Sequence, residues 1–427
     1  MRSLAAALAL ALAAGPAAAQ KNGEAVTIEQ AAAIAVKNSP AALAAEQDII
    51  IARQRVREAR FMALPQLSLS GTLSRLDLEY PALLGSDLGD RYVDPAAGNS
   101  FYSLRAQALQ PLYTGGKNSN TLKLAKTSHN QAKVNFETVR SDAALAAKKA
   151  FYTLLYQRRL KEATSYWLAR ARAQAAQLPK DAFEELEAAI LVSGLTGRNR
   201  QAEGALEASN TELLKVMNRE PGHPVEADGR FEVIPVESGT GSSLVTAMEA
   251  RSELKSELYK AQMDDIAVNM AMIRRYPTIY LGASYDVNAY RFSSMMESAE
   301  RTGSWLASIA IHFPLSYDIW TQVQQRRAQQ RQGELKRAEL QDRIRFEIVS
   351  AHKESAARQE EAARLGEEFS RLKEGYEAAA RTAKPSLPAL RALCALSELE
   401  ERHAAAVYAQ LLARIKLEWA RGRDFSR

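Results

Sequence analysis

The stretch Thr278-Ile-Tyr-Leu-Gly-Ala-Ser-Tyr-Asp-Val-Asn288, which follows Pro277, alternates apolar and polar side chains with a period of two. Successive side chains of a β-strand point to opposite faces, so this pattern predicts a strand with one apolar and one polar face. It has about the length that a tilted strand needs to cross a bilayer. A half-buried strand of a soluble sandwich would look similar, so both readings stay open at this point.

Three further runs, 66–74, 101–110 and 303–313, show the same alternation. In a membrane barrel one face would contact lipid, and we expect there Leu104, Ile279, Leu281, Trp305, Ile309 and Phe313. The other face would line the lumen, with Arg105, Gln107, Asp286, Asn288 and His312. Four strands cannot close a barrel, and an open sheet edge in lipid leaves backbone groups unsatisfied. Two chains would supply eight strands and three would supply twelve.

The chain has two halves with the same order of signals. In each half a helical pattern (27–62 or 243–275) meets a proline, two strand-like runs follow, and a second proline precedes a long helical pattern. That long pattern ends at Pro179 in the first half and at Pro385 in the second. The spacings agree, with 68 residues from Pro111 to Pro179 and 71 from Pro314 to Pro385. The order predicts an internal duplication of a helix-strand-strand-helix unit.

The helical patterns differ in length. Two long ones, 116–178 and 319–384, would each form a rod of roughly 95–100 Å at ~1.5 Å per residue. Four shorter ones cover 27–62, 181–219, 243–275 and 386–421, which gives six helices in all. Their apolar positions are sparse, as expected for a tube wall with water on both sides. A solvated coiled-coil stalk is the alternative.

The chain ends and the middle differ in composition from the two repeats. Arg2, an apolar stretch from Leu4 to Ala14 and Ala17-Ala18-Ala19 predict a secretory signal peptide over residues 1–19. Residues 220–241 hold three prolines and four glycines and are predicted to be a linker. The first repeat is then 20–219 and the second is 242–427.

Composition and motifs exclude several function classes. With 56 basic and 50 acidic residues interspersed, the net charge of +6 forms no concentrated patch along the sequence, so we expect no nucleic-acid partner. Cys394 is the single cysteine, and the five histidines show no metal-binding spacing. The chain has no phosphate-binding G-x-x-x-x-G-K-[ST] loop and no catalytic motif in a suitable context. We therefore expect no enzyme activity, no metal and no cofactor.

Three stretches of the first half and two of the second resemble the TolC-like outer membrane efflux and secretion channels. They are Thr27-Ile-Glu-Gln-Ala-Ala-Ala-Ile-Ala-Val-Lys-Asn-Ser-Pro40, Ala63-Leu-Pro-Gln-Leu67, Gln110-Pro-Leu-Tyr-Thr-Gly-Gly116, Arg275-Tyr-Pro277 and His312-Phe-Pro-Leu315. The resemblance covers about residues 25–425. No single joint is specific, but their order and spacing together are.

The resemblance implies an α+β membrane protein: a homotrimer whose twelve-stranded β-barrel in the outer membrane continues into a twelve-helix periplasmic α-barrel. Such a channel would passively export substrates delivered by an inner-membrane pump, through a periplasmic adaptor, in a tripartite efflux or type I secretion system. Its partners would include outer membrane lipids, and it would reside in the outer membrane of a Gram-negative bacterium and extend into the periplasm. The competing reading is a periplasmic coiled-coil adaptor or structural protein.

The resemblance also places a gate and an adaptor-docking tip at the two periplasmic helix turns. The candidates are Asp181, Glu184, Lys384, Ser386 and Arg391. We expect charge pairing there between Asp181 and the cations Lys384 and Arg391, within or between subunits. Two departures from the family limit the comparison. The family often has Gly-Gly after the strand-to-helix proline in both halves, but here Gly115-Gly116 of the first half is matched by Tyr317-Asp318 in the second. The family also often has an Asp-containing segment at the second periplasmic turn, but residues 384–391 contain no acid.

Overall fold

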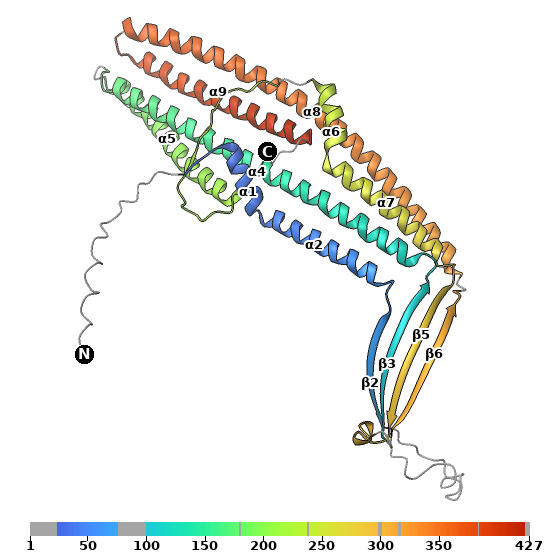
Figure 1. The fold of residues 1–427 in the computed structure, drawn as a ribbon. Helices are drawn as coiled ribbons and strands as arrows, with labels where there is room; N and C mark the ends of the chain where they lie inside the picture. Colours follow the sequence, from blue (N-terminus) through green and yellow to red (C-terminus); the bar gives the residue numbers. More distant parts are fainter. Residues whose placement is uncertain are drawn as a thin grey trace, which may run out of the picture. The chain divides into compact units, whose positions relative to one another are not determined.

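A computed structural model describes residues 24–75, 100–178, 181–236, 239–297, 301–314, 317–382 and 384–422 (Figure 1). The predicted signal peptide, 1–19, lies outside these residues. The chain divides into two compact units. The sheet unit comprises 45–136 and 253–340, and the helical unit comprises 1–44, 137–252 and 341–427. Each unit is described by itself below.

The sheet unit contains a four-stranded antiparallel sheet in the order β2-β3-β5-β6 (Figure 1). Its strands are β2 (Gln66–Arg75), β3 (Ser100–Tyr113), β5 (Thr278–Ala289) and β6 (Thr302–His312). All four strands predicted from the alternating pattern are thus confirmed. β3 runs past Pro111, where the sequence predicted an end, because a register shift between Pro111 and Tyr113 accommodates the residue that cannot donate to the ladder.

Helices adjoin the strands directly. α2 (Pro40–Phe61) leads into β2, and α4 (Lys117–Ala175) follows β3. α7 (Ser252–Ile273) leads into β5, and α8 (Asp318–Thr382) follows β6. With 59 and 65 residues, α4 and α8 confirm the two long helices.

Two helical patterns that the sequence predicted as continuous are broken, so the described residues hold eight α-helices and not six. The first pattern divides into α1 (Ile28–Asn38) and α2 at Ser39, which is extended because the ring of Pro40 disfavours a helical conformation in the residue before it. The second divides into α6 (Thr240–Ala250) and α7 at Arg251, also extended, with φ −61° and ψ 123°. No proline marks that second break.

The turn between β3 and α4 depends on two glycines in the left-handed region, Gly115 with φ 61° and Gly116 with φ 91°. A Cβ on Gly115 would lie 2.8 Å from the Cβ of Tyr276. The second half has Tyr317 and Asp318 at the matching place, and α8 begins at Asp318 itself. Neither of these two residues has a positive φ, so the described part of the second turn does not repeat the left-handed backbone of Gly115 and Gly116.

The helical unit contains α1, α5 (Ala182–Val216), α6 and α9 (Leu387–Ala420), together with α4 from residue 137 onward and α8 from residue 341 onward. Its core is apolar, with Trp167, Leu195, Leu390 and Leu411 fully buried. A two-stranded parallel sheet, β1 (Glu24–Val26) with β4 (Val225–Ala227), was not predicted. β4 lies inside the predicted linker, and three residues are too few for a periodic signal.

Candidate functional site

The polar face of the sheet gathers the residues predicted to line a lumen. Directly opposed residues of paired strands share a face, and Arg105 opposes Asp286, which it binds in an ion pair. Gln107 opposes Ser284, and Asn288 opposes Thr302. His312 opposes Thr278 at the other end of this face. The face therefore carries charged, amide and hydroxyl groups from all four strands.

The other face is apolar along most of its length, with Arg75, Ser100 and Gln110 near its ends. Leu104 opposes Val287, Leu281 opposes Ile309, and Ile279 opposes Ile311. Trp305 is 79% exposed and Ile309 is 66% exposed, although both side chains are apolar. Phe313, the sixth residue predicted for this face, follows the last residue of β6 and is exposed. A sheet with this face cannot remain bare in water.

Both edges of the sheet are open. In the described residues β2 pairs only with β3, and β6 pairs only with β5. Each edge strand therefore presents a row of backbone N–H and C=O groups without a ladder partner.

The predicted tip lies in the helical unit, where α5 and α9 begin. The carboxylate of Asp181 accepts a hydrogen bond from the backbone N–H of Phe183 at 3.0 Å and thereby caps α5. Glu184 lies in the first turn of α5. Ser386 precedes α9 without a side-chain capping bond, and Lys384 lies two residues before it. Pro179, the predicted turn of the first half, lies outside the described residues.

Arg391 is the only one of the two predicted tip cations, Lys384 and Arg391, that forms an ion pair in the described residues, and its partner differs from the expected one. Its guanidinium donates two hydrogen bonds of 2.7 Å to the carboxylate of Glu187 on α5. Within one chain the guanidinium of Arg391 does not bind Asp181, whose carboxylate caps α5, and pairing between subunits stays a prediction. The pairing of a second-half cation with a first-half acid is present, with Glu187 in place of Asp181. Helical spacing offers a signal for it, since Glu187 lies one turn beyond Glu184.

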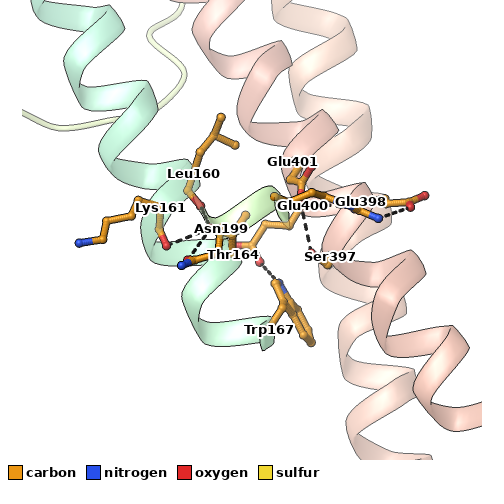
Figure 2. A network of polar contacts seen from close by, with 10 residues as sticks. Leu160, Lys161, Thr164, Trp167, Asn199, Ser397, Glu398, Glu400 and Glu401 are labelled. Atoms are coloured by element: carbon orange, nitrogen blue, oxygen red, sulfur yellow. Dashed lines mark hydrogen bonds and ion pairs between the residues drawn. The ribbon is translucent and has the colours of Figure 1, made fainter. Parts of the chain in front are cut away.

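A polar network joins α4, α5 and α9 in the helical unit (Figure 2). Glu400 of α9 is buried, accepts a hydrogen bond of 2.5 Å from the indole N–H of Trp167 and pairs with Arg159 at 2.8 Å. Thr164 Oγ1 donates to Asn199 Oδ1 at 3.2 Å, which links α4 to α5. No sequence pattern predicted this network, because its members on α4 and α9 lie far apart in the chain. It holds three helices in a fixed register.

The described residues hold no group of three His, Cys, Asp or Glu side chains that could bind a metal ion. Cys394 is buried on α9, and burial raises the pKa of its thiol, which disfavours the reactive thiolate. Every helix in the described part of the chain is too short or too polar to span a membrane.

Residues 31–182 match the outer membrane efflux protein family. The match covers 152 of the 427 residues of the chain. This confirms the resemblance that the joints between helix and strand predicted. A comparison with curated protein sequences finds no match.

Solved structures of outer membrane proteins share the fold of the matched residues and of the rest of the chain. The MtrE outer membrane channel of Neisseria gonorrhoeae is 15% identical, with a TM-score of 0.76 over 92% of this chain and 88% of that one. The CmeC outer membrane channel of Campylobacter jejuni is 13% identical, with a TM-score of 0.75 over 92% and 85%. The outer membrane protein VceC of Vibrio cholerae is 14% identical, with a TM-score of 0.74 over 92% and 96%. At these identities the likeness shows the fold.

Proposed function

We propose that three copies of this chain close a twelve-stranded barrel in the outer membrane of a Gram-negative bacterium. The open edge of β6 in one copy would pair with the open edge of β2 in the next, so that every backbone group in the bilayer is satisfied. The apolar face would then contact lipid and the polar face would line the lumen. The observation that carries this proposal is a sheet with one apolar face and two open edges.

An internal duplication accounts for the fold of each copy. α1 and α6 both have 11 residues, α2 and α7 both have 22, and the residue at each break is extended. α5 and α9 both end just before a residue with positive φ, Asn218 at 52° and Gly422 at 67°. The repeats would be 20–219 and 242–427, joined by 220–241, with 1–19 as a signal peptide. Three copies would place twelve columns of helix around a periplasmic tunnel.

The assembly would act as a passive conduit. Its cargo would arrive from an inner-membrane pump through a periplasmic adaptor, in tripartite efflux or in type I secretion. The tip formed by the starts of α5 and α9 would be the gate and the adaptor-docking end, with the pair between Arg391 and Glu187 holding the resting state. A periplasmic adaptor is the second candidate, but it would have no use for an exposed apolar sheet face.

Fractionation of cells and conductance together test this proposal. We expect the full-length protein to separate with outer membranes and to require detergent for extraction. In planar bilayers it should conduct ions, and Ser308→Arg on the polar face should change the conductance. Extraction by buffer alone would favour the adaptor, and an outer membrane protein without conductance would contradict a channel.

A further inference from the structure

The fold gathers positive charge next to the sheet, although the sequence spreads it along the chain. We consider the ten helix residues closest to the strands in α2, α4, α7 and α8, together with the two residues after α7. They contain four acids and eleven cations, a net charge of +7 against +6 for the whole chain. The cations, which we call the basic collar, are Arg53, Arg55, Arg57, Arg60, Lys117, Lys123, Lys126, Arg274, Arg275, Arg326 and Arg327.

All eleven side chains of the basic collar belong to exposed residues of the sheet unit. In the described residues only Arg274 has an acidic partner within 4.0 Å, Asp318 at 3.9 Å. The other hydrogen bonds of the collar run to neutral groups, such as those from Arg57 to Gln54 and from Arg326 to Gln329. The collar is therefore a surface with an excess of positive charge.

Helix stability explains only part of the collar. Arg60 lies in the last turn of α2, where a cation interacts favourably with the helix dipole. Lys117 is the first residue of α4, where a cation is unfavourable, and the first turn holds no acid to offset it. Helix stability therefore does not explain Lys117, whose cost an anionic partner outside the chain would offset.

Two of the three collar lysines of α4, Lys123 and Lys126, point away from the neighbouring helices α2 and α7. Asn118 donates to the backbone oxygen of Met62, just after α2, at 3.1 Å. Asn135 accepts from Ser256 of α7 at 2.8 Å. At 3.6 residues per turn, Lys123 and Lys126 lie on the wider arc between these two directions. In a closed tube the wider arc between two neighbouring helices faces outward, so Lys123 and Lys126 would not face the cargo, whereas Lys117 points toward α7.

We propose that the basic collar binds the anionic headgroups of the phospholipids that surround the barrel. This inference rests on the proposed function, because the sheet must be in the membrane for the collar to reach its surface. The eleven cations lie within nine residues of the strand-side helix ends or just beyond them, about 14 Å along the helix axis. The attraction between a cation and a charged membrane surface falls off within a Debye length of ~8–10 Å. A planar surface beside the sheet fits this distribution better than an extended polymer in the periplasm.

Native mass spectrometry of the full-length protein in detergent tests the collar. The protein is mixed with equal amounts of phosphatidylglycerol and phosphatidylcholine that have the same acyl chains, and the retained lipids are counted. We expect phosphatidylglycerol to be retained preferentially, with the preference falling about fivefold for each lysine removed that reaches a headgroup. The variant combines Lys117→Gln, Lys123→Gln and Lys126→Gln, and a second variant combines Arg326→Gln and Arg327→Gln. The control combines Lys37→Gln, Arg200→Gln and Lys353→Gln, three exposed cations of the helical unit.

The proposal is supported if the wild type and the control retain phosphatidylglycerol preferentially and either collar variant loses this preference. Equal retention of the two lipids by the wild type overturns it. Binding of the wild type to isolated cell-wall polymer without lipid preference would also overturn it, as would a change of ion selectivity in the α4 variant alone. The same spectra report the number of chains, so a trimer without lipid preference refutes the collar and leaves the channel standing.

Discussion

His403 lies on α9, where its ring stacks on Phe369 at 6.2 Å. Burial lowers the pKa of this imidazole, and Arg159 lowers it further, while Glu400 opposes both. The folded state therefore binds fewer protons here than the unfolded state. The stability contributed by the neutral ring is complete above about pH 6.5 and is lost as the pH falls below that value.

We therefore expect the protein to unfold at a lower temperature at about pH 5.5 than at about pH 7.5. His403→Gln removes the group that must stay neutral, so it should reduce this difference. Thermal unfolding of the wild type and the variant in detergent, at both pH values, measures it. An unchanged difference would show that His403 does not contribute.

Arg391 and Glu187 form an ion pair between α9 and α5, and both side chains are more than a third exposed. Such pairs contribute only about 0–1 kcal/mol each, but the proposed trimer repeats them three times. We expect Arg391→Ala and Glu187→Ala each to raise the open probability of single channels, and the double variant to add nothing more. Glu207→Ala, an exposed acid farther along the same helix and away from the tip, is the control. Additive effects of the two single variants would contradict a shared bond.

Among the elements, β6 has two faces of different polarity, although Leu306 and Ala310 lie on the more polar one. Ile309 opposes Leu281 on the apolar face, whereas its neighbour Ser308 opposes Gly282 on the polar face. Ile309→Arg should cost roughly 2–4 kcal/mol near the bilayer midplane and impair insertion. Ser308→Arg should insert normally. The amount of protein in purified outer membranes measures both, and equal defects would show that the faces are assigned wrongly.

The end of α9 depends on Gly422. Its φ is 67°, and a Cβ there would lie 2.9 Å from the backbone nitrogen of Arg251. Gly422→Ala should therefore destabilise the helical unit by about 1–3 kcal/mol. Gly375→Ala is the matched control, since nothing lies within 4 Å of a Cβ in α8, and it should stabilise by up to about 1 kcal/mol. Thermal unfolding of both variants should show shifts of opposite sign; equal shifts would refute the strain.

Sequence patterns predicted elements where a period repeats over many residues. The alternation of apolar and polar side chains with a period of two predicted all four strands and their two faces, and prolines marked most of the predicted helix ends. The break at Arg251 escaped prediction because it has no proline, and β1 and β4 are too short to show a period. The partner of Arg391 also escaped, because a capping role for Asp181 depends on where α5 begins.

At the scale of the whole molecule, the single chain leaves large apolar side chains exposed. On α8 these are Trp320, Leu335 and Phe346, exposed by 67%, 63% and 76%. Together with the apolar sheet face they form more exposed apolar surface than a single chain in water normally presents. Neighbouring copies and lipid would cover them in the proposed assembly. Four strands per chain are too few to close a barrel, so the sequence predicted that several chains assemble. A single sequence does not specify the number of chains in that assembly.

The mass of the detergent-solubilised assembly tests the central proposal most directly. The full-length protein is expressed, extracted from purified outer membranes and measured by native mass spectrometry without cross-linking. Three copies of the processed chain are expected, because twelve strands then close without an edge. A single chain or a pair as the stable form in the same detergent would contradict a barrel shared by three copies.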